Sequence, residues 1–259
     1  MTSDFDLRGK VALITGGNGG IGLGMAEGLA AAGADVVIWG GKPEKNASAE
    51  AKLRAHGRRV LVQRCDVADE QQVDACFAEA LKQMSRIDGC FANAGVSQAR
   101  SAFQDLDTRE WRRVLSVNLD GAFFTLRAAV RHMVARSKGG DPGGRLVGMA
   151  STAAVHGAAR AHYYAASKGA LIAVIRALAV ELARYGITAN AILPGWIETE
   201  MTAAGMADPK FGAAVLPRIP MRRWGRKEDF AGIAVYLMSD ASRYHTGDSF
   251  VIDGAYTIF

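Results

Sequence analysis

Cysteine is scarce in this chain. The three cysteines, Cys65, Cys76 and Cys90, form no Cys-x-x-Cys pair and lie at no spacing that would share a metal ion with a histidine. The five histidines show no metal-ligand spacing either. The sequence therefore indicates no disulfide framework and no metal site, and we expect the cysteines to be small buried hydrophobes.

Long hydrophobic runs are also missing. No stretch is apolar and long enough to span a bilayer, and residues 1–8 carry two acids and no apolar signal-peptide core. The composition is otherwise that of an ordinary globular protein. We therefore expect a cytoplasmic protein without a membrane partner.

The positive charges are not gathered into any tract. The net charge is +5 and the isoelectric point is near 9.2, but lysines and arginines are dispersed among acids. Nucleic acid binding is therefore not indicated. A mildly basic balance suits an anionic cofactor, although it does not demonstrate one.

Short apolar runs alternate with helical stretches along the whole chain. This alternation predicts βαβ crossovers and a mainly parallel sheet covered by helices on both faces. The chain has no internal repeat, low-complexity tract or long linker, so we interpret residues 1–259 as a single α/β domain. The expected strands are residues 11–14, 36–39, 60–62, 89–92, 145–149, 188–193 and 249–252.

A glycine-rich loop, residues 15–22, stands between the first expected strand and the first expected helix. Glycines let the backbone turn tightly beside a pyrophosphate, and the helix N-terminus offers free N–H groups and a partial positive charge. The position of this loop favours phosphate binding over a plain flexible turn.

The segment after the second strand bears on the cofactor. An acid about 20 residues beyond the glycines would normally bind the adenosine ribose hydroxyls, but this chain has Gly40, Gly41 and Lys42 there. Nothing then repels a 2′-phosphate, and Lys42 could pair with one. We expect NADP(H) or NAD(H), with only a slight preference for NADP(H), because Gly19 adds no second cation and Lys42 is equally compatible with a solvated lysine.

Tyr164 and Lys168 stand four residues apart at the start of an apolar helix, and Ser151 lies thirteen residues before Tyr164. Residues four apart share a helix face, and the apolar residues that follow place this face inward. The pair alone would more often be a packing tyrosine and a snorkelling lysine. A buried ammonium would instead favour the phenolate, so we expect Lys168 to lower the pKa of Tyr164.

Two segments interrupt the alternation. Residues 137–144 form a glycine-rich connector, and residues 198–218 show only weak periodicity. Loops at the carboxyl ends of parallel strands usually carry the binding site. We interpret residues 198–218 as a substrate lid within the single domain.

The glycine loop, Ser151 and the Tyr-x-x-x-Lys pair occur in an order that resembles the short-chain dehydrogenase/reductase family. The resemblance spans essentially the whole chain. It implies a doubly wound Rossmann fold with about seven parallel strands and a catalytic tetrad of Asn118, Ser151, Tyr164 and Lys168. Further matching motifs are Cys65-Asp66-Val67, Ala92-Asn93-Ala94-Gly95, Ser116-Val117-Asn118-Leu119, Leu193-Pro194-Gly195, Arg222-Arg223-Trp224-Gly225 and Ile252-Asp253-Gly254.

The resemblance also implies which residues hold the dinucleotide. Asp66 and Val67 would contact the adenine, although Asp66 is equally placed to cap the following helix. Thr199 would face the carboxamide or the phosphates. The other expected contacts are Gly16, Asn18, Gly20, Ile21, Gly22, Lys42, Asn93, Ala94, Gly95, Tyr164, Lys168, Pro194, Gly195 and Ile197.

Asn118 lies on a helical stripe with Trp111, Leu115 and Ala122, so we expect its amide to be buried and hydrogen-bonded. The pattern alone indicates a structural tie between helix and sheet. The resemblance adds a second, compatible role, in which Asn118 supports a water that links Lys168 to solvent.

The implied reaction is reversible hydride transfer between a nicotinamide and a secondary alcohol or ketone. Tyr164 would be the general acid/base, and Ser151 would donate a hydrogen bond to the developing alkoxide. His156 and Trp196 would join Ser151 and Tyr164 as substrate contacts, although packing explains His156 and Trp196 as well.

Two alternatives stay open. A 3-oxoacyl-[acyl-carrier-protein] reductase would need a basic docking surface, for which Arg131, Arg136, Lys138 and Arg184 are candidates. A dinucleotide-binding regulator without turnover would need the glycine loop but not the tetrad. The resemblance also implies a homotetramer built through the helices of Asn118 and Tyr164 and the C-terminal segment.

Overall fold

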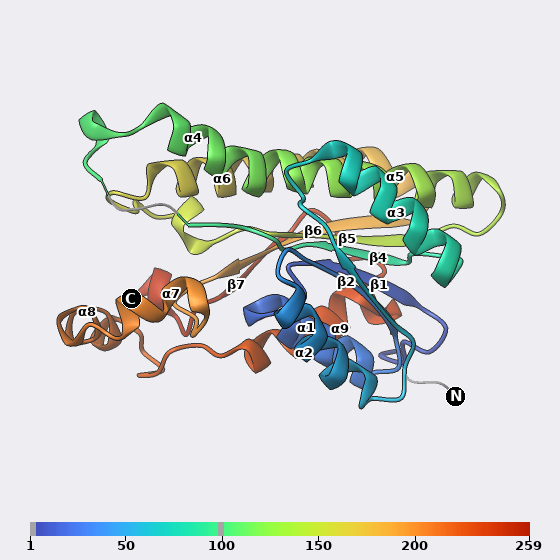
Figure 1. Cartoon of the computed structure of the whole chain (residues 1–259), viewed down its shortest axis with the longest axis horizontal. Coiled ribbons are helices and arrows are strands. Elements are labelled where there is room, and N and C mark those ends of the chain that lie inside the picture. The colour runs from blue at the N-terminus through green and yellow to red at the C-terminus, as the bar shows by residue number, and fades with distance from the viewer. Residues whose placement is uncertain (1–3, 98–100) are drawn as a thin grey trace.

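The computed structural model describes residues 4–97 and 101–259, and Figure 1 shows its three layers. Seven strands form one sheet in the order β3-β2-β1-β4-β5-β6-β7, and every neighbouring pair is parallel. The predicted seven-stranded parallel sheet is confirmed. The strands are β1 (Val11–Thr15), β2 (Asp35–Gly40), β3 (Val60–Arg64), β4 (Gly89–Ala92), β5 (Gly144–Met149), β6 (Ile187–Pro194) and β7 (Ser249–Ile252).

Helices cover both faces of this sheet (Figure 1). Helices α3, α4, α5 and α6 lie on one face, and α1, α2 and α9 lie on the other. The helices are α1 (Gly20–Ala31), α2 (Pro43–Arg54), α3 (Glu70–Met84), α4 (Thr108–Leu115), α5 (Gly121–Lys138), α6 (His162–Leu182), α7 (Glu200–Met206), α8 (Pro209–Val215) and α9 (Ala231–Met238).

The central strands are buried on both faces, and alternate residues enter different cores. In β1, Val11 and Leu13 pack into the core beneath α3, α5 and α6, while Ala12 and Ile14 pack into the core beneath α1 and α9. Successive side chains of a strand point to opposite faces, so double burial requires a continuous apolar run. This is why the strands could be found in the sequence as short unbroken apolar segments.

The chain reverses its direction of winding between β1 and β4. Strands β2 and β3 extend the sheet to one side of β1, and β4 to β7 extend it to the other. The loops that follow β1 and β4 therefore leave the sheet in different directions and open a crevice at its carboxyl edge. The glycine loop follows β1, and Asn93 follows β4.

A π-helical turn, Ser116–Asp120, separates α4 from α5. Its extra residue shifts the helical phase between α4 and α5. Ala122 of the predicted stripe is buried, whereas Trp111 is exposed and Val114 is the buried residue of α4. Asn118 is nevertheless fully buried, as predicted.

The cysteines are free, and two of them match the expectation. Cys65 and Cys90 are buried, whereas Cys76 is only partly buried and its Sγ lies near the Arg64 carbonyl oxygen. Burial raises the pKa of the Cys90 thiol to about 12, which keeps it protonated and unreactive at neutral pH.

Candidate active site

The glycine loop makes a turn that requires glycine. Gly16 has a φ of +64°, which disfavours residues with a side chain. A Cβ on Gly22 would lie 2.3 Å from the Gly16 carbonyl oxygen, so α1 can approach β1 closely only without it. The N-cap of α1, Gly19, makes no side-chain cap hydrogen bond, and the first turn contains no acid. The loop thus presents the free N–H groups and positive helix end that suit a phosphate.

Thr15 ties the glycine loop to the end of β4. Its hydroxyl accepts hydrogen bonds of 2.9 Å from the N–H groups of Asn93 and Ala94, and the Asn93 amide donates to the Thr15 carbonyl oxygen at 2.8 Å. Because these bonds join the two strands that flank the crevice, they fix the position of the loop.

Lys168 is buried on the inner face of α6, as predicted. Its Nζ donates a hydrogen bond of 2.7 Å to the carbonyl oxygen of Met149, at the end of β5. Burial lowers the pKa of Lys168 from its ordinary value to about 8. A Cβ on Gly95 would lie 3.4 Å from this Nζ, so a glycine at position 95 leaves room for the lysine.

The Asn118 side chain forms three hydrogen bonds beside Lys168. Its side-chain oxygen accepts from the Val96 N–H at 2.7 Å, and its amide nitrogen donates to the Val96 carbonyl at 3.0 Å and to Ser167 Oγ at 3.2 Å. The side chain is thereby engaged in tying the π-helical turn to the segment after β4 and to α6. The expected structural tie is present in the fold.

Ser151 and Tyr164 are hydrogen-bonded to one another, and this bond favours the phenolate of Tyr164. The surrounding protein nevertheless desolvates the phenol, which raises the pKa of Tyr164 above its ordinary value. The prediction that Lys168 would lower this pKa is wrong for the cofactor-free protein. The Lys168 ammonium is 5.6 Å from the centre of the tyrosine ring and is bonded to Met149 instead.

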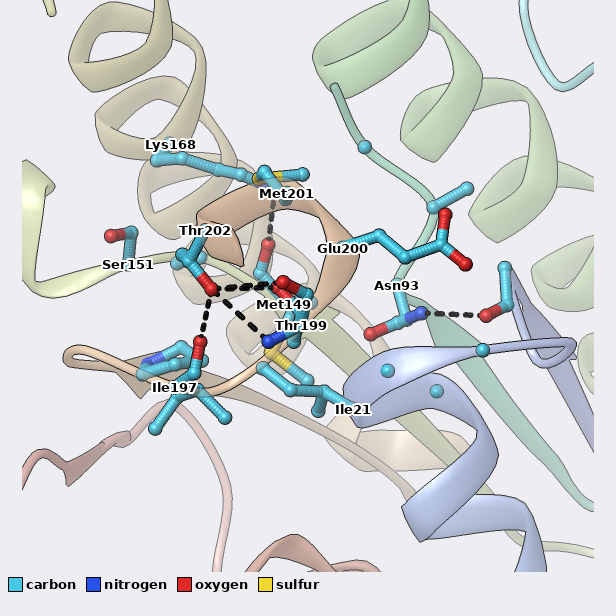
Figure 2. A pocket seen from close by; sticks show the side chains of 18 of the residues that line it. Ile21, Asn93, Met149, Ser151, Lys168, Ile197, Thr199, Glu200, Met201 and Thr202 are labelled. Atoms are coloured by element: carbon cyan, nitrogen blue, oxygen red, sulfur yellow. Dashed lines mark hydrogen bonds between the residues drawn. The ribbon is translucent and has the colours of Figure 1, made fainter. Parts of the chain in front are cut away.

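A pocket of about 290 Å³ connects these groups. Figure 2 shows Ser151 and Lys168 on one side, Asn93 and Ile21 on the other, and residues of α7 between them. Fifteen of the predicted site residues line it, namely Gly16, Asn18, Gly20, Ile21, Gly22, Asn93, Ala94, Gly95, Ser151, Tyr164, Lys168, Pro194, Gly195, Ile197 and Thr199.

Six predicted site residues do not line the pocket. Asn118 lies behind Lys168, and Lys42 is exposed at the N-cap of α2. Asp66 is exposed and accepts from the Ala68 N–H, whereas Asp69 is the N-cap of α3, so the expectation that Asp66 caps that helix is wrong. The other three are Val67, His156 and Trp196.

Two neighbours of the catalytic candidates, Tyr163 and Thr152, bond to the backbone. The hydroxyl of Tyr163 donates to the Asp107 carbonyl oxygen at 2.9 Å, and the hydroxyl of Thr152 donates to the Pro194 carbonyl oxygen at 3.2 Å. Neither residue lines the pocket. The structure therefore agrees with the alignment of Tyr164 and Ser151 to the family pattern.

Seven lining residues were not among the predicted site residues: Gly19, Lys45, Met149, Ala150, Glu200, Met201 and Thr202. Lys45, on α2, forms an ion pair with Glu200, on α7. This bond holds the pKa of Glu200 below its ordinary value. The sequence offered one weak signal, since Lys45 follows Lys42 by three residues and lies on the same side of α2.

The N-terminus of α7 lies against the glycine loop. Thr199 caps α7 through a reciprocal arrangement with Thr202, whose hydroxyl also donates to the Ile197 carbonyl oxygen at 2.6 Å. The Thr199 methyl lies 3.2 Å from where a Cβ on Gly20 would be. Residues 198–218 contain α7 and α8, and residues 199–202 of this segment line the pocket.

Comparisons with known proteins agree with this geometry. The family profile described as enoyl-(acyl carrier protein) reductase matches residues 16–257. A 2-dehydro-3-deoxy-D-gluconate 5-dehydrogenase of Pseudoalteromonas atlantica is 38% identical over 257 residues, which cover 99% of each chain. The chain belongs to the short-chain dehydrogenase/reductase family.

Two further family members bear on the function. A 3-oxoacyl-[acyl-carrier-protein] reductase of Chlamydia pneumoniae is 35% identical and covers 98% of this chain and 99% of its own. The crystal structure of a gluconate 5-dehydrogenase of Burkholderia cenocepacia in complex with NADP and tartrate superposes with a TM-score of 0.91, at 35% identity, over 98% of this chain and 97% of that one. These relatives confirm the prediction of an oxidoreductase of this family acting on an alcohol or ketone.

The described residues contain neither a membrane-spanning helix nor a metal-binding cluster. No helix within residues 4–97 and 101–259 is long and apolar enough to cross a membrane. Nor does that part of the chain contain a group of three or more histidines, cysteines or acids that could hold a metal ion.

Proposed function

We propose that this short-chain dehydrogenase/reductase interconverts a secondary hydroxyl and a ketone on a polyhydroxy carboxylic acid, with NADP(H) as cofactor. The observation that carries the proposal is the pocket, which joins the glycine loop to Ser151, Tyr164 and Lys168. A dinucleotide at the loop and a hydroxyl at Tyr164 would occupy one continuous space. The names of the gluconate-related family members support the sugar-acid class.

The residues of the pocket fit a dinucleotide. The uncapped N-terminus of α1 and the glycines at 16, 20 and 22 can receive the pyrophosphate, and Thr199 lies directly across from Gly20. Lys168 and Tyr164 can hold the nicotinamide ribose at the other end. Lys45 lines the pocket, and it can pair with a 2′-phosphate better than the exposed Lys42.

A bound nicotinamide would supply the hydride chemistry that side chains lack. In the reducing direction, the Tyr164 hydroxyl gives its proton to the carbonyl oxygen, and Ser151 donates a hydrogen bond to the same oxygen. The raised pKa of Tyr164 keeps this proton in place at neutral pH in the cofactor-free protein. The Lys168 ammonium lies 5.6 Å from the centre of the Tyr164 ring, and Asn118 holds the backbone around Lys168.

The basic residues that an acyl-carrier-protein reductase would use for docking lie away from the pocket. Arg136 is only 12% exposed and is paired with Asp88, and Arg184 is stacked over Tyr185. These residues lie where α5 and α6 end and the next strands begin, whereas the pocket lies at the carboxyl edge of the sheet. The four predicted arginines and lysines therefore do not surround the pocket mouth.

The test is a panel of substrates with both cofactors. Purified protein should reduce NADP⁺ with polyhydroxy acids such as gluconate faster than NAD⁺ with the same acids. It should show little activity toward 3-oxoacyl thioesters. Turnover of the thioester alone would favour the alternative reductase, and dinucleotide binding without turnover of any substrate would favour the regulator.

We also propose a homotetramer in the cytoplasm, with residues 198–218 acting as a lid. Exposed apolar side chains on the two long helices and at the C-terminus support the assembly, since Phe123, Val180 and Phe259 are 46%, 84% and 73% exposed in the single chain. Light scattering should give four times the monomer mass. A monomer would contradict the proposal.

A further inference from the structure

A cluster of four side chains includes Trp196, which stands in the chain between two residues that line the pocket. Its centre is Tyr256, which is buried near the C-terminus. The rings of His156 and Trp196 meet the Tyr256 ring edge-on, at centroid distances of 5.7 and 6.4 Å. The guanidinium of Arg218 lies over the same ring, 4.7 Å from its centre. We call these four residues the Tyr256 cluster.

The Tyr256 cluster adjoins the reaction site rather than the glycine loop. Trp196 stands between Gly195 and Ile197, both of which line the pocket. His156 follows Ser151 by five residues, on the loop after β5. The C-terminal segment packs on Gly195, since a Cβ there would lie 2.5 Å from Asp253 Cβ. Figure 1 shows the C-terminus close to α7 and α8, consistent with the packing of Tyr256 against Val215.

Tyr256 is held firmly in this position. The two carboxylate oxygens of Asp253 accept hydrogen bonds of 2.8 Å from the N–H groups of Ala255 and Thr257, on either side of Tyr256. Ala255 has a φ of +73°, which turns the chain back over the pocket end. The aromatic platform beneath Arg218 is therefore built by the fold and not by a loose terminus.

The cluster offers hydrogen-bond donors and positive charge but no acid. Among the described residues, the Arg218 guanidinium, the Tyr256 hydroxyl and the Trp196 indole nitrogen have no hydrogen-bond partner. The nearby acids are engaged elsewhere: Asp253 binds backbone N–H groups, and Glu198 lies 3.8 Å from Arg226. The exposed Arg218 guanidinium, with the Trp196 N–H and the Tyr256 hydroxyl as further donors, suits an anion rich in acceptors.

We propose that Arg218, stacked on Tyr256, binds the carboxylate of the substrate. This inference rests on the proposed function, because it requires the reacting hydroxyl to lie at Tyr164 and Ser151. The stacked guanidinium leaves its N–H edge free to form a bidentate pair with a carboxylate. The Tyr256 hydroxyl and the Trp196 indole nitrogen then remain for the substrate's own hydroxyl groups. The cluster thus selects acids over neutral polyols of the same length.

The experiment compares one anionic and one neutral ligand. Binding of gluconate and of gluconamide to the NADP-loaded protein is measured by calorimetry, together with their turnover. The wild-type protein should bind gluconate about 10-fold or more tightly than gluconamide, as expected for a charge-assisted pair. Arg218→Gln should remove this preference and leave gluconamide binding unchanged.

A matched control is available in the same chain. Arg184 lies 4.9 Å over the ring of Tyr185 in the same kind of stack, but far from the pocket at the opposite edge of the sheet. Arg184→Gln should keep the wild-type preference for the acid. Equal binding of both ligands by the wild type, or an unchanged preference in Arg218→Gln, would overturn the assignment. Absence of turnover on any polyhydroxy acid by the wild type would instead overturn the proposed function.

Discussion

The two ends of the pocket are built in different ways. At the cofactor end, one short loop between β1 and α1 supplies a continuous run of lining residues, and Thr15 fastens it to the end of β4. On the proposed substrate side, His156, Trp196, Arg218 and Tyr256 do not line the pocket itself, and they come from four separate segments that meet only in the folded chain. The first end is a local property of the sequence, and the second is a tertiary one.

This contrast has a functional consequence. A loop that binds through backbone N–H groups recognises pyrophosphate in any dinucleotide, because no side chain of the loop enters the recognition. A cluster assembled from separate loops can change its ligand by single substitutions while the fold is kept. Relatives with the same cofactor end can therefore act on different alcohols.

The cofactor end should lose dinucleotide binding when one glycine of the loop gains a side chain. In Gly22→Ala, the new Cβ would lie 2.3 Å from the Gly16 carbonyl oxygen and 2.5 Å from the Asn93 amide nitrogen. We expect dinucleotide binding to weaken by about 100-fold or more, which corresponds to about 3 kcal/mol. Gly232→Ala, on α9, is the control, because a Cβ there meets nothing within 4 Å and Gly232 does not line the pocket. Near-normal binding by Gly22→Ala in a fluorescence titration would contradict this view of the loop.

The buried lysine of the catalytic centre, which lies between the two ends, should lower the stability of the folded protein. Burial lowers the pKa of Lys168 to about 8, while the unfolded chain titrates near 10.5. The penalty for the buried ammonium is therefore full below pH 8, about 3 kcal/mol, and is relieved as pH rises from 8 to 10.5. We expect cofactor-free Lys168→Met to resist urea better than the wild type at pH 7.

The same comparison at higher pH provides the check. The stability advantage of Lys168→Met should shrink when urea unfolding is repeated at pH 9.5, because the wild-type lysine is then largely neutral in the folded state. Lys52→Met serves as the control, since it replaces an exposed lysine on α2. An advantage that is absent at pH 7, or that does not change with pH, would argue against a buried ammonium.

The preference for NADP(H) over NAD(H) should decrease by a smaller amount when Lys45 is removed. Lys45 lines the pocket and is held by Glu200, whereas Lys42 is exposed one turn earlier. We expect Lys45→Ala to weaken NADP(H) about 5-fold more than NAD(H), in keeping with about 1 kcal/mol for a partly exposed charge pair. Lys42→Ala should change the ratio less. The measurement is the ratio of kcat/KM for the two cofactors, and an equal or larger change in Lys42→Ala would reverse the assignment.

Much of the fold and of the cofactor end could be predicted from the sequence because both depend on local patterns. Strands buried on two faces appear as unbroken apolar runs, and the Gly16 to Gly22 loop lies between one such run and a helix. Tyr164 and Lys168 share a helix face, so their proximity also followed from spacing alone.

The remaining features depend on contacts between distant segments. Residue spacing could not show that Lys168 Nζ donates a hydrogen bond to the Met149 carbonyl oxygen. For this reason the predicted direction of the Tyr164 pKa shift was wrong. The pairing of Lys45 with Glu200, which lies 155 residues later in the chain, could not be predicted from spacing. Arg218 gave no signal in the sequence, because its aromatic partner Tyr256 comes from the C-terminal segment.

The central claim is that one pocket brings a dinucleotide to the Tyr164 hydroxyl, and removing that oxygen atom tests it most directly. Turnover of gluconate and binding of NADP(H) are measured in Tyr164→Phe beside Tyr163→Phe, whose lost hydroxyl bonds only to the Asp107 carbonyl. We expect Tyr164→Phe to lose activity by about 100-fold or more while NADP(H) still binds, and Tyr163→Phe to remain active. Retained turnover in Tyr164→Phe would contradict the account.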